Sequence, residues 1–284
     1  MYINNIFLEE SLHYTEQKPS FWDRSNEIAD LDEIAEYCKH NEEKILYDDE
    51  KIWYEEIEKG MQFCDWLFSG EEKGREDDRR MFLEILDKKS KAIEGTKLCG
   101  IKSTNNIYLS LGEYAESVSN EKEYIACRRD ILSEITDVEE YEEFMHSCFI
   151  NSCFAENILQ EMRHIEDFAM HTKEITKNLA VLNDEAIDLY NQYHDNLKEA
   201  MDILSAKLLE CSGDANHRKF LFFPFTYEEV FEGETVAREK EIMCEPHLKL
   251  INKHSNLRIY FQWKDEQVGR GEKVLVGRIG GHPY

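Results

Sequence analysis

The chain has 284 residues, and its 60 acidic against 34 basic side chains give a formal net charge of −26 at pH 7. Apolar residues make up 42% and aromatic residues 12%, which is enough for a buried core and argues against a disordered chain. No run of about 18 apolar residues occurs, so the sequence predicts no membrane-spanning helix.

The scarcity of proline predicts that most of the chain is helical. Only four prolines occur, at positions 19, 224, 246 and 283, and the interval between the first two is rich in helix-forming residues. Apolar residues at three- and four-residue steps predict amphipathic helices over Ile28–Lys39 and Asp49–Phe68. Thr136 and Glu139 form a capping-box pattern that predicts another helix start. The poorly periodic segment Thr96–Ser119 is expected to be a loop with one short strand or helix.

Two long helices are predicted in the second half of this interval. The first runs from Asn151 to about Leu182. Asn183 and Asp184 then offer an N-cap for a helix that continues to Leu209, beyond which Gly213 ends the helical pattern.

After residue 216 the apolar period changes from that of a helix to that of a strand. Strands are predicted over Phe220–Glu232, Val236–Ile251, Leu257–Trp263 and Lys273–Gly277, with a hairpin loop over Asp265–Glu272. Four consecutive strands favour an antiparallel meander that helices cover on one face. The predicted fold class is therefore α+β, with an acidic, mostly α-helical region at residues 1–213 and an antiparallel β-sheet region at 214–284.

Charge changes at the same boundary. Residues 215–284 carry a net charge of +1, whereas the residues before them carry −27. The whole protein should repel nucleic acid at long range, whereas its last 42 residues would not, so any binding of RNA is expected in the C-terminal region. The alternative is that a terminal sheet simply contains fewer glutamates than helices do.

The strand region carries the best candidate catalytic residues. The two-residue period places His247 and Lys249 on one strand face, and Arg258 and Tyr260 on one face of the next strand. His282 follows a Gly-Gly pair at the end of the chain. Two imidazoles can divide the general base and general acid roles of RNA cleavage, while Lys and Arg stabilise the phosphorane, without a metal or another cofactor. Both histidines are expected on an exposed face.

The sequence LRIYF, a polar hairpin and KVLVGRIGGH together resemble the last two strands of RelE-type ribonuclease toxins. The resemblance covers the last 40 or so residues, 245–284, and extends to about 65 at most. It implies a metal-independent endoribonuclease that acts as a bacterial toxin or an anti-phage defence effector. The acidic helical region is not part of that small fold and would be a fused partner, a substrate-recognition domain or an inhibitory domain.

A different class of function fits the same sequence. The strands could be merely amphipathic, with a solvated polar face, and the chain a non-catalytic acidic interaction or regulatory protein that binds a basic partner. In either case we expect a protein partner, such as an antitoxin, a sensor or a subunit.

Other motifs in the sequence are weaker indications of a functional site. Glu143/His146 and Glu161/His164 have the i, i+3 spacing of a carboxylate–imidazole metal pair, yet their helices would have to supply further ligands. The eight cysteines include no Cys-x-x-Cys pair, and Cys148 and Cys153 are interpreted as core residues. With no signal-peptide pattern at the N-terminus, we expect reduced thiols and a cytoplasmic location.

Overall fold

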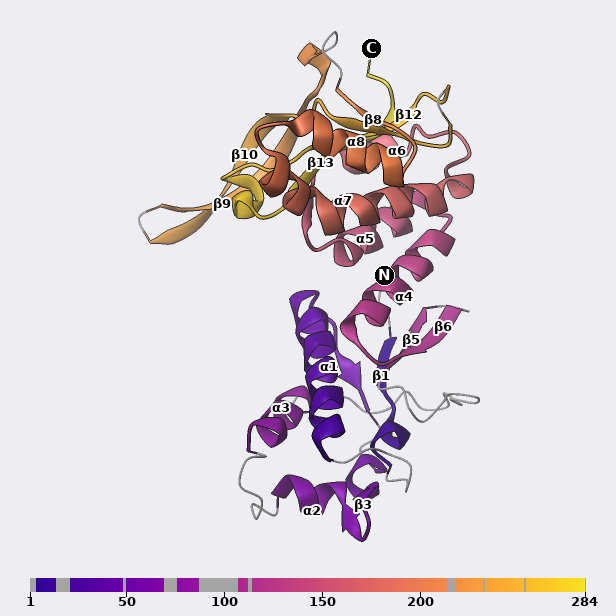
Figure 1. The fold of residues 1–284 in the computed structure, drawn as a ribbon, viewed down its shortest axis with the longest axis vertical. Helices are drawn as coiled ribbons and strands as arrows, with labels where there is room; N and C mark the ends of the chain where they lie inside the picture. The colour runs from indigo at the N-terminus through magenta and orange to yellow at the C-terminus, as the bar shows by residue number, and fades with distance from the viewer. Residues whose placement is uncertain are drawn as a thin grey trace. The chain divides into compact units, whose positions relative to one another are not determined.

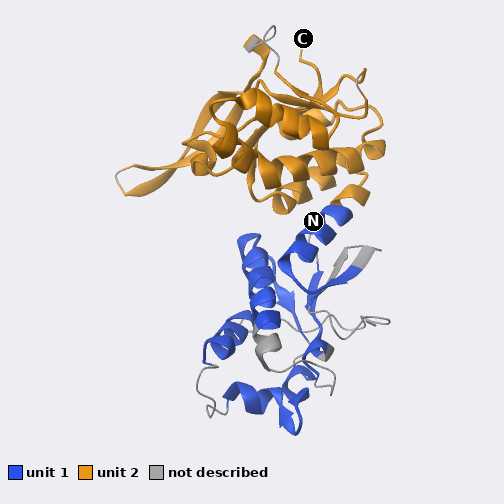
Figure 2. Cartoon of the chain, viewed as in Figure 1, with its two compact units in different colours: residues 1–131 blue, residues 132–284 orange. Residues whose placement is uncertain are grey.

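The computed structural model describes residues 4–13, 21–47, 50–68, 76–86, 107–111, 114–213, 218–231, 233–252 and 254–283. They form a mixed α+β fold, as the sequence predicts, with small sheets and with helices mostly in the N-terminal part (Figure 1). The chain divides into two compact units, Met1–Ile131 and Leu132–Tyr284 (Figure 2). None of the described helices is both long and apolar enough to cross a membrane.

Unit 1 contains a four-stranded sheet in the order β2-β1-β5-β6. Its strands are β1 (Asn4–Phe7), β2 (Ile45–Leu46), β5 (Ile107–Leu111) and β6 (Tyr114–Val118). Its helices are α1 (Phe21–His40), α2 (Phe63–Phe68), α3 (Glu76–Leu86) and α4 (Glu121–Glu134), the last of which continues past the division between the units. The short elements are the 3-10 turns Glu9–Leu12 and Ile52–Tyr54 and the strand pair β3 (Glu56–Glu58) and β4 (Met61–Gln62).

The structure corrects two predictions in unit 1. The helix predicted over Ile28–Lys39 is confirmed within α1, but the helix predicted over Asp49–Phe68 is wrong. A 3-10 turn, the β3–β4 hairpin and α2 occupy its described part, and Gly60 provides the turn with a φ of +78°. Part of Thr96–Ser119 lies outside the described residues, and the rest forms the β5–β6 hairpin.

An aromatic cluster forms the core of unit 1 around Phe63. Its ring centroid lies 5.0 Å from that of Phe82 and 5.8 Å from that of Trp66. Phe7 of β1 contacts Phe82 edge-on at 5.9 Å, so the cluster joins the sheet to α2 and α3. All four side chains are at most 3% exposed.

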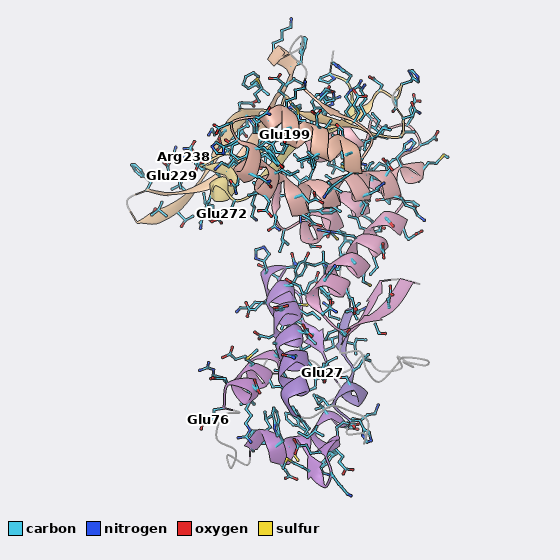
Figure 3. The ribbon with its side chains drawn as sticks, in the orientation of Figure 1. Glu27, Glu76, Glu199, Glu229, Arg238 and Glu272 are labelled. Carbon is cyan, nitrogen blue, oxygen red and sulfur yellow. The ribbon has the colours of Figure 1, made fainter. Side chains whose placement is uncertain are left out.

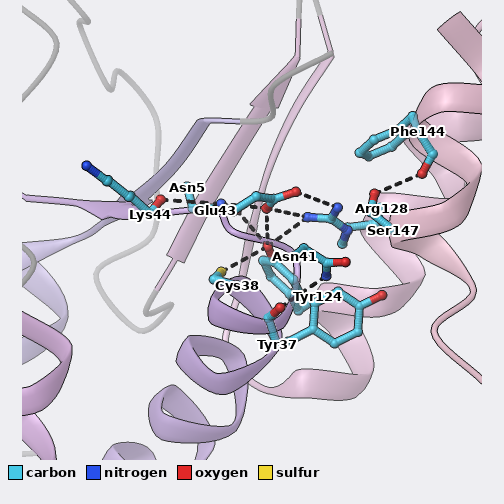
Figure 4. Close-up of polar contacts among 10 residues, drawn as sticks. All are labelled: Asn5, Tyr37, Cys38, Asn41, Glu43, Lys44, Tyr124, Arg128, Phe144 and Ser147. Atoms are coloured by element: carbon cyan, nitrogen blue, oxygen red, sulfur yellow. Dashed lines mark hydrogen bonds and ion pairs between the residues drawn. The ribbon is translucent and has the colours of Figure 1, made fainter. Parts of the chain in front are cut away.

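A buried ion pair connects the turn after α1 to α4 (Figure 4). The Arg128 guanidinium donates two hydrogen bonds of 2.7 Å to the Glu43 carboxylate, and the arginine side chain is 0% exposed. Tyr124 on the same helix donates to Asn5 of β1, and Asn5 in turn donates to Glu43. Burial raises the pKa of the neighbouring Cys38 thiol to about 12, so it remains protonated beside the Tyr124 hydroxyl.

Unit 2 is built on a five-stranded sheet in the order β7-β13-β12-β11-β8. Its strands are β7 (Ser152–Phe154), β8 (Cys211–Ser212), β11 (His247–Lys249), β12 (Leu257–Gln262) and β13 (Val274–Gly281), and only β7 and β13 are parallel neighbours. A separate hairpin joins β9 (Phe222–Phe231) to β10 (Glu234–Met243). The helices are α5 (Val138–Cys148), α6 (Ile158–Met162), α7 (Thr172–Tyr193) and α8 (Leu197–Lys207), and 3-10 turns cover Phe168–Met170, Arg218–Phe220 and Val268–Gly271.

The two long helices predicted in this unit are replaced by shorter elements. Residues 151–182 form β7, α6, a 3-10 turn and the first part of α7, and α7 passes through the predicted N-cap. Asn183 is 6% exposed and does not cap a helix, because its Oδ1 accepts hydrogen bonds from the Asn151 backbone and the Ser152 hydroxyl. The predicted start of α5 is one residue early, since Asp137 is the cap and accepts from the Glu140 N–H.

The predicted meander is confirmed for β11, β12 and β13, and the predicted hairpin loop lies between the last two. The strand predicted over Val236–Ile251 is divided around Pro246 into β10 and β11, which belong to different sheets. Two further strands of the five-stranded sheet, β7 and β8, precede residue 214. The predicted boundary between residues 213 and 214 therefore does not coincide with the division between the units at residues 131 and 132.

A β-bulge at Gly277 sets the register between β12 and β13. Tyr260 pairs with Arg278 and Phe261 pairs with Val276, so Gly277 is the extra residue of β13. A Cβ atom at Gly277 would lie 2.5 Å from Phe223 Cδ2 and 2.7 Å from the Cys244 sulfur. Only glycine fits this position without movement of the buried neighbours.

We predict that Gly277→Ala lowers the free energy of unfolding by about 1–3 kcal/mol, the usual cost of overpacking a core. Gly281→Ala is the matched control in the same strand, since its Cβ would meet Asn256 at an ordinary 3.5 Å. We expect that change to stay within about 0.5 kcal/mol. Urea unfolding followed by tryptophan fluorescence compares the two variants, and equal stabilities would contradict the packing argument.

A second prediction concerns the buried ion pair of unit 1. Glu43→Gln leaves the Arg128 charge buried without its carboxylate and should cost about 3–5 kcal/mol of stability. Glu139→Gln breaks a pair with Arg163 in which both side chains are 49% exposed, and it should cost less than about 1 kcal/mol. The double variant Glu43→Gln/Arg128→Met should recover part of the loss in thermal unfolding. No recovery would mean that the charge is not the cause.

Candidate functional site

A row of polar side chains crosses four strands of the five-stranded sheet. Ser212 of β8 pairs with His247 of β11, His247 pairs with Tyr260 of β12, and Tyr260 pairs with Arg278 of β13. Directly paired residues of neighbouring strands project from the same face of a sheet. The register therefore aligns a hydroxyl, an imidazole, a phenol and a guanidinium on one face.

His247 is fixed by contacts on both ring nitrogens. Its Nε2 lies 3.2 Å from the Ser212 hydroxyl oxygen, and its Nδ1 lies 3.4 Å from the Glu245 carbonyl oxygen. A carbonyl oxygen only accepts, so the neutral ring that satisfies both contacts carries its proton on Nδ1 and accepts the serine proton at Nε2. This orientation leaves Nε2 as the basic nitrogen of the site.

Tyr260 contacts both histidines of the predicted site. Its ring centroid is 4.9 Å from the ring of His247 and 6.2 Å from the ring of His282, which it meets edge-on. Tyr260 is 0% exposed and also belongs to the apolar cluster formed with Phe223 and Leu275. The phenol ring thus holds the two imidazoles on one side of the sheet from a rigid position.

The cations of the site have different partners. Lys249 and Arg258 are direct register partners, two positions along the strands from His247 and Tyr260 and therefore on the same face. The Lys249 ammonium lies 2.8 Å from Glu210, whereas Arg258 donates to the backbone carbonyl and the side-chain oxygen of Asn256. Both of these acceptors belong to Asn256 and are neutral, so no carboxylate neutralises the Arg258 charge there.

Arg278 completes the row through an ion pair with α6. Its Nη1 lies 2.9 Å from the Glu161 carboxylate, and its Nε donates to the Gly281 carbonyl oxygen at 2.8 Å. The second bond fixes the backbone immediately before His282. Arg278 therefore positions the end of β13 while Glu161 neutralises its charge.

The structure brings together three of the five residues that the sequence singles out, since His247 and His282 both contact Tyr260. Lys249 and Arg258 face each other on the same two strands, two positions along. Ser212 also belongs to the row and Glu161 pairs with its Arg278, and neither is a site residue that the sequence predicts. A two-residue strand such as β8 has no periodic signal, and the Glu161/His164 spacing pointed to a metal instead of to an arginine.

One expectation about the site is wrong. His247 was expected on an exposed face, but only 5% of it is exposed, because its ring packs against Tyr260 and its Nε2 meets Ser212. His282 is half-buried, with Nδ1 2.9 Å from the Pro283 carbonyl oxygen. Of the two imidazoles, His282 is the one that solvent reaches more readily.

Neither Glu-x-x-His pair forms a metal site among the described residues. His146 contacts Glu142 at 2.9 Å, and Glu161 is paired with Arg278. No group of three His, Cys, Asp or Glu side chains in the described ranges has the geometry to hold a metal ion. Cys148 is a buried core residue as predicted, and Cys153 packs at the edge of a core cluster.

Comparisons with known proteins return no relative: no protein-family model matches the chain, and no curated protein or solved structure is significantly similar to it. The geometry of the site is therefore the basis for any functional inference.

We predict that Ser212→Ala lowers the free energy of unfolding by about 1 kcal/mol, since it removes the hydroxyl that faces a buried ring nitrogen. Ser212→Thr keeps the hydroxyl and should retain most of that stability. Long-range ¹H–¹⁵N NMR of His247 should show the Nδ1–H tautomer in the unmodified protein. An Nε2–H tautomer would contradict the assigned arrangement.

Proposed function

We propose that unit 2 cleaves RNA without a metal ion, with His247 and His282 as its acid–base pair. The observation that carries this proposal is the contact of both imidazoles with the single ring of Tyr260, with Arg258 two positions away on the same face of β12. Two imidazoles and an unmatched guanidinium are the groups that phosphodiester transesterification uses. The resemblance of the last strands to RelE-type toxins is in agreement with this chemistry.

The reaction begins with the 2′-hydroxyl of the nucleotide. A neutral imidazole removes its proton while the 2′-oxygen attacks phosphorus, and the bond from phosphorus to the 5′-oxygen breaks. The second imidazole, initially protonated, gives its proton to the leaving 5′-oxygen. The products are a 2′,3′-cyclic phosphate and a 5′-hydroxyl, and Arg258 stabilises the extra negative charge of the phosphorane between them.

The burial of His247 adds a condition to this mechanism. Its basic nitrogen faces Ser212 on β8, which is an edge strand of the sheet. The 2′-hydroxyl must take the place of the Ser212 hydroxyl for His247 to act as the base. His282 then serves as the acid, because its more accessible ring can reach the leaving oxygen.

A second candidate function is supported by the ion pairs of the site. Lys249 and Arg278 are each paired with a carboxylate of the same unit, Glu210 and Glu161. In this alternative, the ion pairs of the row hold the strands in place and have no catalytic role. The chain would then be a non-catalytic acidic protein that binds a basic partner.

We predict that the full-length protein cleaves RNA in the presence of EDTA, with a bell-shaped pH dependence because one imidazole must be neutral and the other protonated. Single-stranded RNA, transfer RNA and ribosome-bound messenger RNA are the substrates to test. His282→Ala and Arg258→Ala should each lower kcat/KM by about 10²- to 10⁴-fold. Products carrying a 2′,3′-cyclic phosphate are expected.

The controls use residues away from the row. His164→Ala and Arg270→Ala remove an exposed imidazole and an exposed guanidinium of the same unit and should leave cleavage unchanged. Thermal unfolding shows whether each variant is folded. No cleavage of the three substrates would support the non-catalytic function instead, whereas cleavage that His282→Ala retains would contradict the role of His282 as the acid.

A further inference from the structure

The β9–β10 hairpin has one face that the rest of unit 2 covers and one that it does not. The strands pair along their full length, from Phe222 opposite Met243 to Phe231 opposite Glu234. Burial alternates along β9 near its start, where Phe223 and Phe225 are buried and Phe222 and Thr226 are exposed. The ribbon therefore has an inner and an outer face, as the two-residue period of a strand requires.

The inner face attaches the hairpin to the body of the unit. Phe223, Phe225 and Ile242 belong to the apolar core cluster that contains Tyr260. Lys240 on this face lies 2.6 Å from Asp265. Burial alone raises the pKa of Asp265, but the Lys240 contact and two backbone N–H donors outweigh it and hold that pKa below its usual range.

The outer half of the hairpin extends beyond this attachment (Figure 1). From residue 228 to residue 239 the described residues are exposed, apart from half-buried Val236. Figure 3 shows Glu229 and Arg238 on this part of the ribbon, and they pair across the inner face at 3.3 Å. This pair neutralises both of its charges, and Glu234 at the tip is the other carboxylate on the inner face of this half.

The outer face has a different composition. Its register pairs place Glu228, Glu239 and Glu241 on this face, and none of them has an ion-pair partner among the described residues. Phe222 at the base is 50% exposed and Val230 at the tip is 74% exposed. The face thus presents three unmatched carboxylates between two exposed apolar side chains.

We propose that this outer face binds an extended, basic segment of a protein partner. Residues 241, 239 and 237 of β10 lie on the outer face, and the first two are glutamates. The third is Ala237, and Glu228 of β9 lies directly opposite it. Their spacing is that of alternate residues in a strand, about 7 Å, so cations at every second position of an extended chain would match them. Apolar residues at the two ends of that segment would cover Phe222 and Val230.

Charge argues against the other occupants. A second copy of this chain also carries a net charge of −26, and anionic lipid or RNA would meet the same three carboxylates. A basic protein segment gains attraction where these would be repelled, and complementary charge raises the association rate. This surface lies outside the catalytic row, so the inference does not depend on RNA cleavage.

The experiment measures the binding of a short fluorescent peptide with lysine at every second position and valine at both ends. We expect the full-length protein to bind it more tightly than an isomer whose lysines are adjacent. Replacement of Glu228, Glu239 and Glu241 by Gln should weaken binding of the alternating peptide about tenfold, since each exposed pair contributes little by itself. Phe222→Ser/Val230→Ser should weaken it to a similar extent.

Matched controls separate the outer face from the general acidity of the chain. Phe231→Ser changes an apolar residue that is 55% exposed at the tip, but on the inner face, and should leave the affinity unchanged. A triple neutralisation elsewhere in unit 2, at the exposed carboxylates Glu166, Asp188 and Glu272, should also have no effect. Circular dichroism checks that every variant is folded.

The proposal is overturned if both peptide isomers bind equally or if the control neutralisation weakens binding as much as the hairpin variant does. Outer-face variants that instead change binding to phosphatidylglycerol vesicles, binding to single-stranded RNA, or the mass of the protein in sedimentation would assign the surface to a membrane, a nucleic acid or a second copy.

Discussion

The register between β12 and β13 determines what the rest of unit 2 can do. Because a one-residue slip between strands moves every side chain to the opposite face, the bulge at Gly277 decides which residues of β13 share a face with Tyr260. With the bulge, Arg278 falls opposite Tyr260, reaches Glu161, and fixes the backbone that leads to His282. The absent side chain of Gly277 also lets Phe223 approach the sheet, so one glycine links the site to the attachment of the hairpin.

The sequence predicts the parts of this fold whose periodicity is local. Leu257–Gln262 alternates apolar with polar or amphipathic residues, the run from Val274 is rich in β-branched residues, and the meander follows from their order. Strands β7 and β8 contain three and two residues, too few for a pattern, and they are defined by pairing with β13 and β11. Asn183 shows why the helix boundaries were misplaced: it is a favourable cap residue by type, but its amide is used to bind the start of β7. Such tertiary use of a side chain leaves no local trace in the sequence.

The same limit applies to the candidate site. The two-residue period correctly places His247 beside Tyr260 once the strands pair in order, and it places Lys249 beside Arg258. The period does not reveal which elements cover this face of β11 and β12. In the structure residues of β9 and β10 do so, because Tyr260 joins them in an apolar cluster. Nor can the period supply Ser212, which comes from a strand before the meander and lies 35 residues ahead of His247 in the sequence. Periodicity therefore finds the residues of the row within consecutive strands, whereas their accessibility depends on the packing of the whole unit.

Most acidic residues precede residue 214 in the sequence, and in unit 2 the fold places some of them beside basic residues of the C-terminal strands. Glu161 and Glu210 belong to the acidic part before residue 214, and each neutralises a cation of the C-terminal strands, Arg278 and Lys249. An RNA phosphate approaching this face would meet Arg258, whose hydrogen bonds go to neutral oxygens of Asn256 and not to a carboxylate. Further phosphate contacts would require Lys249 or Arg278 to exchange its carboxylate partner for a phosphate. The planar guanidinium of Arg278 can donate two parallel hydrogen bonds to either anion. In the proposed ribonuclease, the acidic residues of the helical part would thus act as competitors for the substrate, and binding of RNA would be an exchange of anions at cations that are already positioned.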